Sequence, residues 1–223
     1  MQMEGNYSKE DVLQEMMKIG YLPTESVTIA VSEYLSGRAL NLYGEFGGGK
    51  SVFWKVMSMV KVRHFASGSI VRPFCFAVIP MARVASFSLA EIRRWVYMYE
   101  NWELVVDDIG SEPKMVDYGK RSEAIDLILS MRESSPMRTH ITTNVDGSHI
   151  MERYGERISD RISYAKRIKF EGKSMRGVDR FRVAMNEDEN YKILQTSDCD
   201  TVVKAGLPKS VNPRFNWNGE DYD

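Results

Sequence analysis

Apolar positions near the start of the chain repeat with the spacing of amphipathic helices. Within residues 8–20 they fall on one helical face, with Ser8 placed as an N-cap and Gly20 as a stop. A second helix is predicted over residues 25–35, before Gly37. The chain therefore begins with a short helical segment.

From residue 39 onward the pattern changes to short apolar runs that alternate with helical periodicity. Short apolar runs bounded by turn residues are typical of buried strands. Strands are predicted at residues 39–43, 73–79, 104–106, 139–142 and 167–170. Helices are predicted at residues 50–62, 89–99, 121–133 and 148–162, the last with an interruption near Gly155. Strands separated by helices indicate an α/β three-layer sandwich, with a central parallel sheet covered by helices on both faces.

The same pattern divides the chain into three parts. Residues 1–37 form a helical lead-in, and residues 38–185 form the α/β core. Residues 186–223 are polar and contain Gly206, Pro208 and Pro213, so we expect a partly mobile C-terminal extension.

Composition narrows the class of protein. The chain has 223 residues, is 43% hydrophobic and 27% charged, and carries a formal net charge of −1, which is ordinary globular composition. Its two cysteines and three histidines are scattered, so no zinc signature is present. The sequence contains no 18-residue apolar run and no secretory signal at its start. We expect a cytoplasmic protein that makes no membrane contact.

The strongest motif is Gly-Glu-Phe-Gly-Gly-Gly-Lys-Ser at residues 44–51, which matches the phosphate-binding loop, or P-loop, pattern. Its glycines allow successive backbone amides to converge on phosphate, and the helix that follows adds its positive end. Lys50 would reach the β- and γ-phosphates of ATP, and Ser51 would bind Mg²⁺. The predicted nucleotide-binding set is Gly44, Gly47, Gly48, Gly49, Lys50, Ser51 and Val52.

Two polar strand ends follow the loop in sequence. Asp107 and Asp108 end an apolar strand, at the edge where ligands of parallel sheets bind. Asp107 would hold the Mg²⁺ shell through water, and Asp108 would polarise the attacking water. Asn144 ends the next strand and could hydrogen-bond the attacking water or the γ-phosphate. The alternatives are a turn-forming role for the aspartates and helix capping by Asn144.

Three segments together resemble the DnaC/DnaI helicase-loader and IstB-like group of AAA+ ATPases. They are residues 107–112 (Asp-Asp-Ile-Gly-Ser-Glu), residues 142–144 (Thr-Thr-Asn) and residues 154–162 (Tyr-Gly-Glu-Arg-Ile-Ser-Asp-Arg-Ile). The resemblance covers about residues 40–176. It implies a P-loop NTPase of the AAA+/RecA-like type that hydrolyses ATP with Mg²⁺.

The resemblance also implies roles for three arginines. Arg161 would be the arginine finger that reaches the γ-phosphate of a neighbouring subunit, with Arg157 as the second candidate. Arg176 would contact nucleotide in its own subunit. An alternative for Arg161 is a surface ion pair with Glu156 or Asp160.

The partners implied by the resemblance are single-stranded DNA, a replicative helicase or transposase, and further copies of the chain. Cations beside aromatic rings favour DNA binding by the segment with Arg93, Arg94, Trp95, Tyr97, Tyr99 and Trp102. Other basic candidates are Lys114, Lys120, Arg121, Lys166, Arg167, Lys169 and Lys173. The helical spacing of Trp95, Met98 and Trp102 is equally typical of a core face, and the basic strand could simply be solvated.

Three functions remain open at this point. The first is an ATP-driven helicase loader or DNA-remodelling ATPase, with slow hydrolysis that depends on assembly. The second is an adaptor that binds ATP without hydrolysing it, because Asp108 stands where the family usually has the longer Glu. The third is a small-molecule P-loop kinase, although the sequence shows no clear basic lid.

Overall fold

A computed structural model describes residues 7–63, 69–71, 73–112, 115–117, 120–122, 124–171 and 191–193. Arg176, Lys114 and Lys173 lie outside these residues, as does most of the expected C-terminal extension. None of the described helices is long and apolar enough to cross a membrane.

The central sheet contains six strands in the order β10-β4-β5-β8-β1-β9, and every neighbouring pair is parallel. The strands are β1 (Leu40–Tyr43), β4 (Phe76–Pro80), β5 (Glu103–Ile109), β8 (Thr139–Thr143), β9 (Lys166–Lys169) and β10 (Tyr191–Ile193). Strand β8 lies between β5 and β1, so the loops that follow these three strands meet at one edge of the sheet. Strand β10 was not predicted and extends the sheet beside β4.

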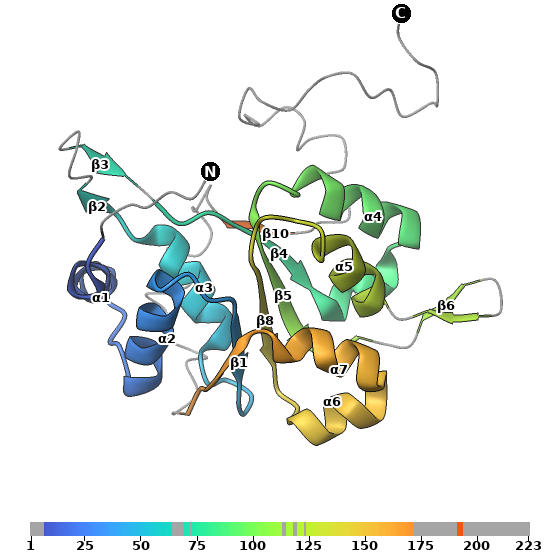
Figure 1. Ribbon diagram of the computed structural model, residues 1–223. Helices are drawn as coiled ribbons and strands as arrows, with labels where there is room; N and C mark the ends of the chain where they lie inside the picture. Colours follow the sequence, from blue (N-terminus) through green and yellow to red (C-terminus); the bar gives the residue numbers. More distant parts are fainter. Residues whose placement is uncertain are drawn as a thin grey trace, which may run out of the picture.

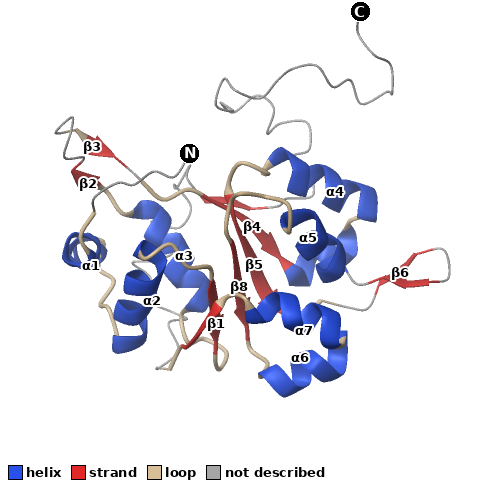
Figure 2. Cartoon of the chain, viewed as in Figure 1, coloured by secondary structure: helices blue, strands red, loops and turns tan. Residues whose placement is uncertain are grey.

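Helices cover both faces of the sheet (Figure 1). One face carries α1 (Lys9–Lys18), α2 (Glu25–Leu35) and α3 (Lys50–Met59), and the other carries α4 (Leu89–Met98), α5 (Ala124–Arg132), α6 (Gly147–Tyr154) and α7 (Glu156–Ser163). Figure 2 shows the strands as the middle of three layers. The predicted α/β three-layer sandwich is confirmed.

Successive side chains of a strand point to opposite faces of the sheet, so the sheet contributes to two hydrophobic cores. Val105 packs with the buried residues of α1–α3, whereas its neighbour Val106 packs with those of α4–α7. Phe53 and Trp54 fill the first core, and Trp95 and Ile125 contribute to the second. Because both faces are covered, β4 and β5 each contain an unbroken apolar run, at residues 76–79 and 104–106.

Several boundaries differ from the prediction because short strands interrupt the helical pattern. Helix α3 ends at Met59, since Val60 adopts an extended conformation that leads into β2 (Val62–Arg63) and β3 (Ile70–Val71). Helix α5 begins at Ala124 rather than 121, because β6 (Met115–Asp117) and β7 (Lys120–Ser122) form a hairpin before it. The predicted break at Gly155 separates α6 from α7. A 3₁₀ helix, η1 (Met81–Ser86), follows β4.

A buried polar network fastens α2 to the edge of the sheet where the strands begin. The Tyr34 hydroxyl donates to Glu103 Oε2 (2.7 Å), and Arg138 Nε donates to Glu103 Oε1 (2.7 Å). His140 Nδ1 accepts the Leu40 amide (3.1 Å), so its Nε2 donates to Glu103 Oε2 (3.2 Å). Burial lowers the pKa of His140, which therefore stays neutral.

Candidate functional site

The loop between β1 and α3 takes the conformation that its glycines allow. Gly44, Gly47 and Gly49 have positive φ angles of 138°, 82° and 87°. Gly49 is also the N-cap residue of α3, which begins at Lys50. The sequence therefore curls the backbone directly before a helix N-terminus, where amides and the helix dipole attract phosphate. Val52 packs against the core beneath the loop.

Lys50 is folded back over this loop and is largely buried. Its Nζ donates to the carbonyls of Gly44 (2.8 Å) and Glu45 (2.8 Å) and to Asn144 Oδ1 (2.6 Å). Burial lowers the pKa of Lys50, while the carboxylate of Asp108 opposes that shift. The ammonium group thus lies between the loop and the polar end of β8.

Asp107 accepts hydrogen bonds from two hydroxyl groups on neighbouring elements. Ser51 Oγ donates to Asp107 Oδ1 over 2.8 Å, and Thr142 Oγ1 donates to the same oxygen over 2.6 Å. Thr142 Oγ1 also accepts the amide of Asp108 (2.8 Å). The sequence motifs singled out Ser51 and Asp107. The role of Thr142 was missed, because it depends on the pairing of β5 with β8. The only sequence signal was its place in the Thr-Thr-Asn segment at residues 142–144.

Asp108 is held in an unusual backbone conformation. Its φ is 61°, a value that residues other than glycine rarely adopt, and the register between β5 and β8 shifts at this point. Asn144 Nδ2 donates to Asp108 Oδ1. Burial and the adjacent Asp107 raise the pKa of Asp108. Strained backbone of this kind is a feature of many functional sites.

Asn144 therefore bridges the two groups that face each other across the edge of the sheet. Its oxygen accepts from Lys50, and its nitrogen donates to Asp108. The N-cap of α6 is Asp146, whose side chain accepts the His149 amide. Helix capping is therefore the task of Asp146, and Asn144 faces the loop.

The oxygens at this edge fit a magnesium ion. Ser51 Oγ and Asp107 Oδ1 lie 2.8 Å apart. Octahedral Mg²⁺ holds neighbouring oxygens about 2.8–3.0 Å apart and prefers hydroxyl, carboxylate, phosphate and water oxygens. The two side chains predicted to hold the ion, directly or through water, are thus already side by side.

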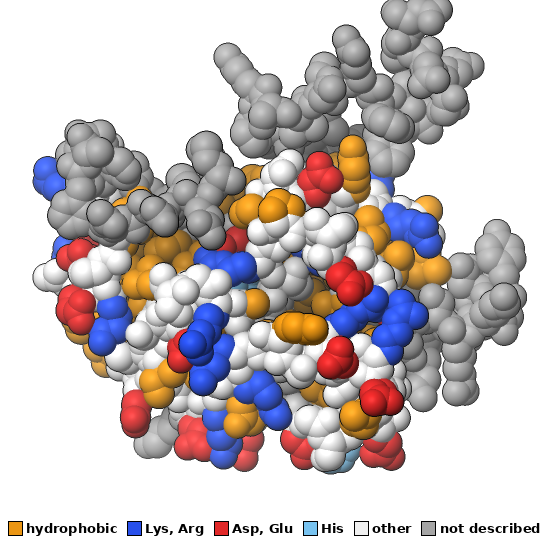
Figure 3. Space-filling model, viewed as in Figure 1, with side chains coloured by type: hydrophobic (Ala, Val, Ile, Leu, Met, Phe, Trp, Pro, Cys, Tyr) orange, Lys and Arg blue, Asp and Glu red, His pale blue; other side chains and the backbone are white. Residues whose placement is uncertain are grey.

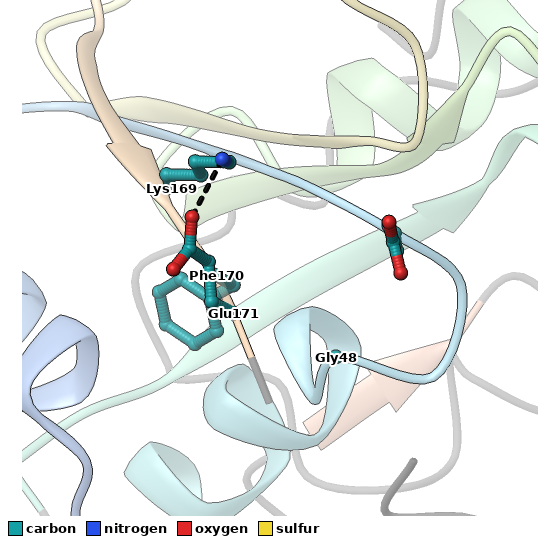
Figure 4. Close-up of a pocket in the computed structure, with 5 residues that line it drawn as sticks. Gly48, Lys169, Phe170 and Glu171 are labelled. Atoms are coloured by element: carbon teal, nitrogen blue, oxygen red, sulfur yellow. Dashed lines mark ion pairs between the residues drawn. The ribbon is translucent and has the colours of Figure 1, made fainter. Parts of the chain in front are cut away.

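A hollow of about 220 Å³ borders the loop on the side of β9. It is lined by Glu45, Gly48, Lys169, Phe170 and Glu171 (Figure 4). Lys169 and Glu171 form an ion pair of 2.5 Å there. The backbone of Phe170 lies so close to the loop that only glycine fits at residue 44.

Arg161 is held within its own chain. Its guanidinium donates to Asp126 (2.7 Å), Ser130 (2.9 Å) and Glu133 (2.8 Å), all on or beside α5, and its side chain is 17% exposed. Arg157 lies one turn away on α7 with its side chain 68% exposed. To reach a neighbouring subunit, Arg161 would have to leave these three close contacts, whereas Arg157 would leave only longer ones, to Asp126 (3.6 Å) and to Ser130 (3.5 Å).

The partners of Arg161 differ from those that the sequence suggested. The ion pairs join α7 to α5, through residues distant in sequence, rather than to Glu156 or Asp160. Local spacing could not reveal these contacts, because they depend on how the two helices pack. Arg176 lies outside the described residues, so its predicted role stays a prediction.

The aromatic residues suggested for stacking with DNA bases are mostly core residues. Trp95 and Tyr99 are buried, with ring centroids 4.7 Å apart, and only Tyr97 is well exposed. The core alternative was therefore correct for this helix. On β9, Arg167 lies over the Tyr43 ring (4.4 Å). Figure 3 shows basic and acidic side chains interspersed across the face that it draws.

A buried carboxylate that the sequence analysis did not single out, Glu112, lies in the turn that follows β5. Glu112 accepts the Gly110 amide (2.9 Å) and the hydroxyl of Tyr154 on α6. Its presence in the quoted motif at residues 107–112 was the only sequence signal. Its partner on α6 could not be inferred from spacing.

Comparison with known proteins gives the following similarities. No protein-family model matches the chain, and no curated protein sequence matches it significantly. The structure is similar to that of a proposed primosome component from Streptococcus pyogenes serotype M3, with 19% identity and a TM-score of 0.45, over 78% of this chain and 85% of the other. It is also similar to the crystal structure of the DnaC helicase loader, with 18% identity and a TM-score of 0.49, over 74% of this chain and all of the other.

Proposed function

We propose that this chain, which has a P-loop NTPase fold, binds ATP with Mg²⁺ and hydrolyses it. The observation that carries the proposal is the meeting of three separate segments at one edge of the sheet. The start of α3, directly after the glycine-rich loop, supplies Lys50 and Ser51. Strand β5 supplies Asp107 and Asp108, and the residue after β8 is Asn144. Cation, hydroxyl, carboxylates and amide are the groups that phosphoryl transfer to water requires.

Each side chain has a task in this reaction. The loop amides and Lys50 would bind the phosphates, exchanging the carbonyl contacts of Lys50 for phosphate oxygens. Ser51 and Asp107 would hold Mg²⁺, which neutralises charge on the phosphates. Asp108 would accept a hydrogen bond from the attacking water, and Asn144 would orient that water relative to Lys50.

The decisive test of the ATPase proposal removes the ammonium group of Lys50. Lys50→Ala should weaken ATP binding or slow hydrolysis by about a hundredfold or more, because an interaction with charged phosphate worth about 3 kcal/mol is lost. Binding is measured with a fluorescent ATP analogue, and turnover by phosphate release with and without Mg²⁺. Lys61→Ala makes the same charge change at an exposed lysine after α3 and should leave both unchanged. Normal binding and turnover in Lys50→Ala would refute the ATPase proposal.

The cellular role that we propose is that of a DnaC/IstB-like helicase loader or DNA-remodelling ATPase. Support comes from the resemblance of residues 107–112, 142–144 and 154–162 to that group. Its partners would be single-stranded DNA, a replicative helicase or transposase, and further copies of the chain, which would meet the nucleotide through Arg161 or Arg157. Arg157 is the more available of the two.

One observation favours a second candidate, an adaptor that binds ATP without turnover. Asp108 is short, and one of its oxygens already accepts from Asn144. Turnover measured at rising protein concentration, with and without single-stranded DNA, distinguishes the two functions. Tight binding with no phosphate release under any of these conditions would favour the adaptor.

A further inference from the structure

Glu112 is the most enclosed carboxylate near the proposed site, with only 3% of its surface exposed. One carboxylate oxygen accepts the Gly110 amide (2.9 Å), and the other accepts the Tyr154 hydroxyl. Arg153 lies 3.9 Å from the same carboxylate and donates to the carbonyls of Gly110 (2.8 Å) and Glu112. A buried carboxylate with this many donors is held in one position.

These contacts fix the turn that directly follows the catalytic aspartates. Gly110 has a φ of 103°, and Ser111 donates to the Asp108 carbonyl through both its amide (3.1 Å) and its hydroxyl (2.6 Å). A β-carbon at Gly110 would lie only 3.3 Å from the side chain of Val145, the residue after Asn144. The backbone at Asp108 is strained, so its conformation depends on such surrounding contacts.

The residues that contact Glu112, Tyr154 and Arg153, lie on α6, the helix directly before α7. Tyr154 ends α6, and Gly155 separates it from α7, which bears Arg157 and Arg161. A continuous set of hydrogen bonds therefore joins α6 to the turn after Asp108.

We propose that Glu112 is a positioning residue for Asp108, and that Tyr154 and Arg153 make the position of Asp108 depend on the position of α6. This inference rests on the ATPase proposed above. The Glu112 carboxylate is occupied by the Gly110 amide and the Tyr154 hydroxyl. It acts by holding the Gly110 turn, so that the Asp108 carboxylate faces Asn144 and Lys50.

The chain supplies a matched control at the opposite edge of the sheet. There Tyr34 donates to a second carboxylate that is largely buried, Glu103, beside Arg138. Both sites thus combine tyrosine, buried carboxylate and arginine, but only one lies beside Asp108. Tyr154→Phe and Tyr34→Phe each remove one hydroxyl and should destabilise the fold similarly, by about 1–3 kcal/mol.

The experiment measures kcat, KM for ATP and thermal stability in both variants of the full chain. Tyr154→Phe should lower kcat about ten- to a hundredfold, because a small displacement of a catalytic group has effects of that size, with KM within about twofold. Tyr34→Phe should leave kcat unchanged. Glu112→Gln, which keeps an acceptor oxygen, should retain more kcat than Glu112→Ala. Equal kcat values in Tyr154→Phe and Tyr34→Phe would overturn the proposal.

A second readout does not depend on turnover. Hydrogen exchange at the Gly110 amide should be faster in Tyr154→Phe than in the wild type and unchanged in Tyr34→Phe. Unchanged exchange at Gly110 in both variants would overturn the proposed contact. If the wild-type chain hydrolyses no ATP, the ATPase proposal fails, and the exchange rate alone decides whether Tyr154 and Glu112 hold the turn.

Discussion

At the scale of single residues, Gly44 is the position where the phosphate-binding loop tolerates least change. A β-carbon there would lie 2.3 Å from the backbone oxygen of Phe170, and the φ of 138° disfavours any side chain. Because the obstacle is backbone, no side-chain movement relieves it. Gly44→Ala should therefore destabilise the fold by about 2–5 kcal/mol through combined backbone strain and overpacking, measured by urea unfolding.

Gly37 provides the control for this prediction. Its φ is 87°, but a β-carbon there would meet nothing within 4 Å. Gly37→Ala introduces strain without collision and should destabilise the fold by only about 1–2 kcal/mol. Equal losses in the two variants would mean that Phe170 does not constrain the loop.

The sequence predicted those residues whose chemistry belongs to a local motif. Lys50 and Ser51 follow from the glycine-rich pattern, and Asp107 follows from its place at the end of an apolar strand. Thr142 and Glu112 could not be predicted in the same way. Their contacts depend on which strand lies beside β5 and on how α6 packs, and neither is encoded in residue spacing.

At the scale of elements, Arg132 connects the loop between α4 and β5 with the loop between α5 and β8. From the end of α5 its guanidinium donates to the carbonyls of Tyr99, Glu100, Trp102, Met137 and Arg138. Burial lowers the pKa of Arg132 to about 10, so the group remains charged at neutral pH. The guanidinium of Arg132 therefore joins the loop that leads into β5 to the loop that leads into β8.

Replacing Arg132 should show how much stability this arrangement provides. Arg132→Met leaves buried carbonyls without donors and should lower the free energy of unfolding by about 3–5 kcal/mol. Arg132→Lys keeps the charge but has too few donors in one plane, so an intermediate loss is expected. Urea unfolding measures both, and Arg93→Met on the exposed face of α4 is the control. A loss in Arg132→Met as small as in the control would refute the role.

Element types were easier to predict than element ends. The capping box of Ser8 with Asp11 and the glycine at residue 155 are local signals, and both mark real boundaries. The end of α3 and the start of α5 were misplaced, because the chain forms a small antiparallel hairpin after α3 and another before α5. Short strands next to a helix can continue its apolar spacing, so the sequence pattern alone assigns them to the helix.

At the scale of the whole molecule, the alternation of strands and helices was sufficient to predict the parallel sheet and its two covered faces. The order of the strands was not predicted, because periodicity does not specify which strands are neighbours. That order matters for the proposed site: β8 between β5 and β1 brings Asn144 between Lys50 and Asp108. The edge strand β10 was also missed, since it pairs far from its place in the chain.

The opposite edge of the sheet makes the stability of the whole fold depend on pH. Glu103 is largely buried, which by itself would raise its pKa, but hydrogen bonds from His140 and Tyr34 and the charge of Arg138 lower that pKa from 4.5 to about 2. Burial lowers the pKa of His140 below 6.5. The unfolded chain takes up both protons more readily, so the free energy of unfolding should fall as pH drops below about 6.5 and more steeply below about 4.5.

The Glu103→Gln variant isolates the contribution of this carboxylate to the pH dependence of stability from the contributions of the other acidic groups. The variant should be less stable at pH 7, because Arg138 loses a charged partner (2.5 Å), but its stability should fall less steeply between about pH 4.5 and 2. By the size of the pKa shift, the difference in this range should be on the order of 3 kcal/mol. Urea unfolding at a series of pH values measures both slopes. Parallel curves for the two proteins below pH 4.5 would show that Glu103 keeps an ordinary pKa, so that the network joining α2 to the sheet is not what acid disrupts.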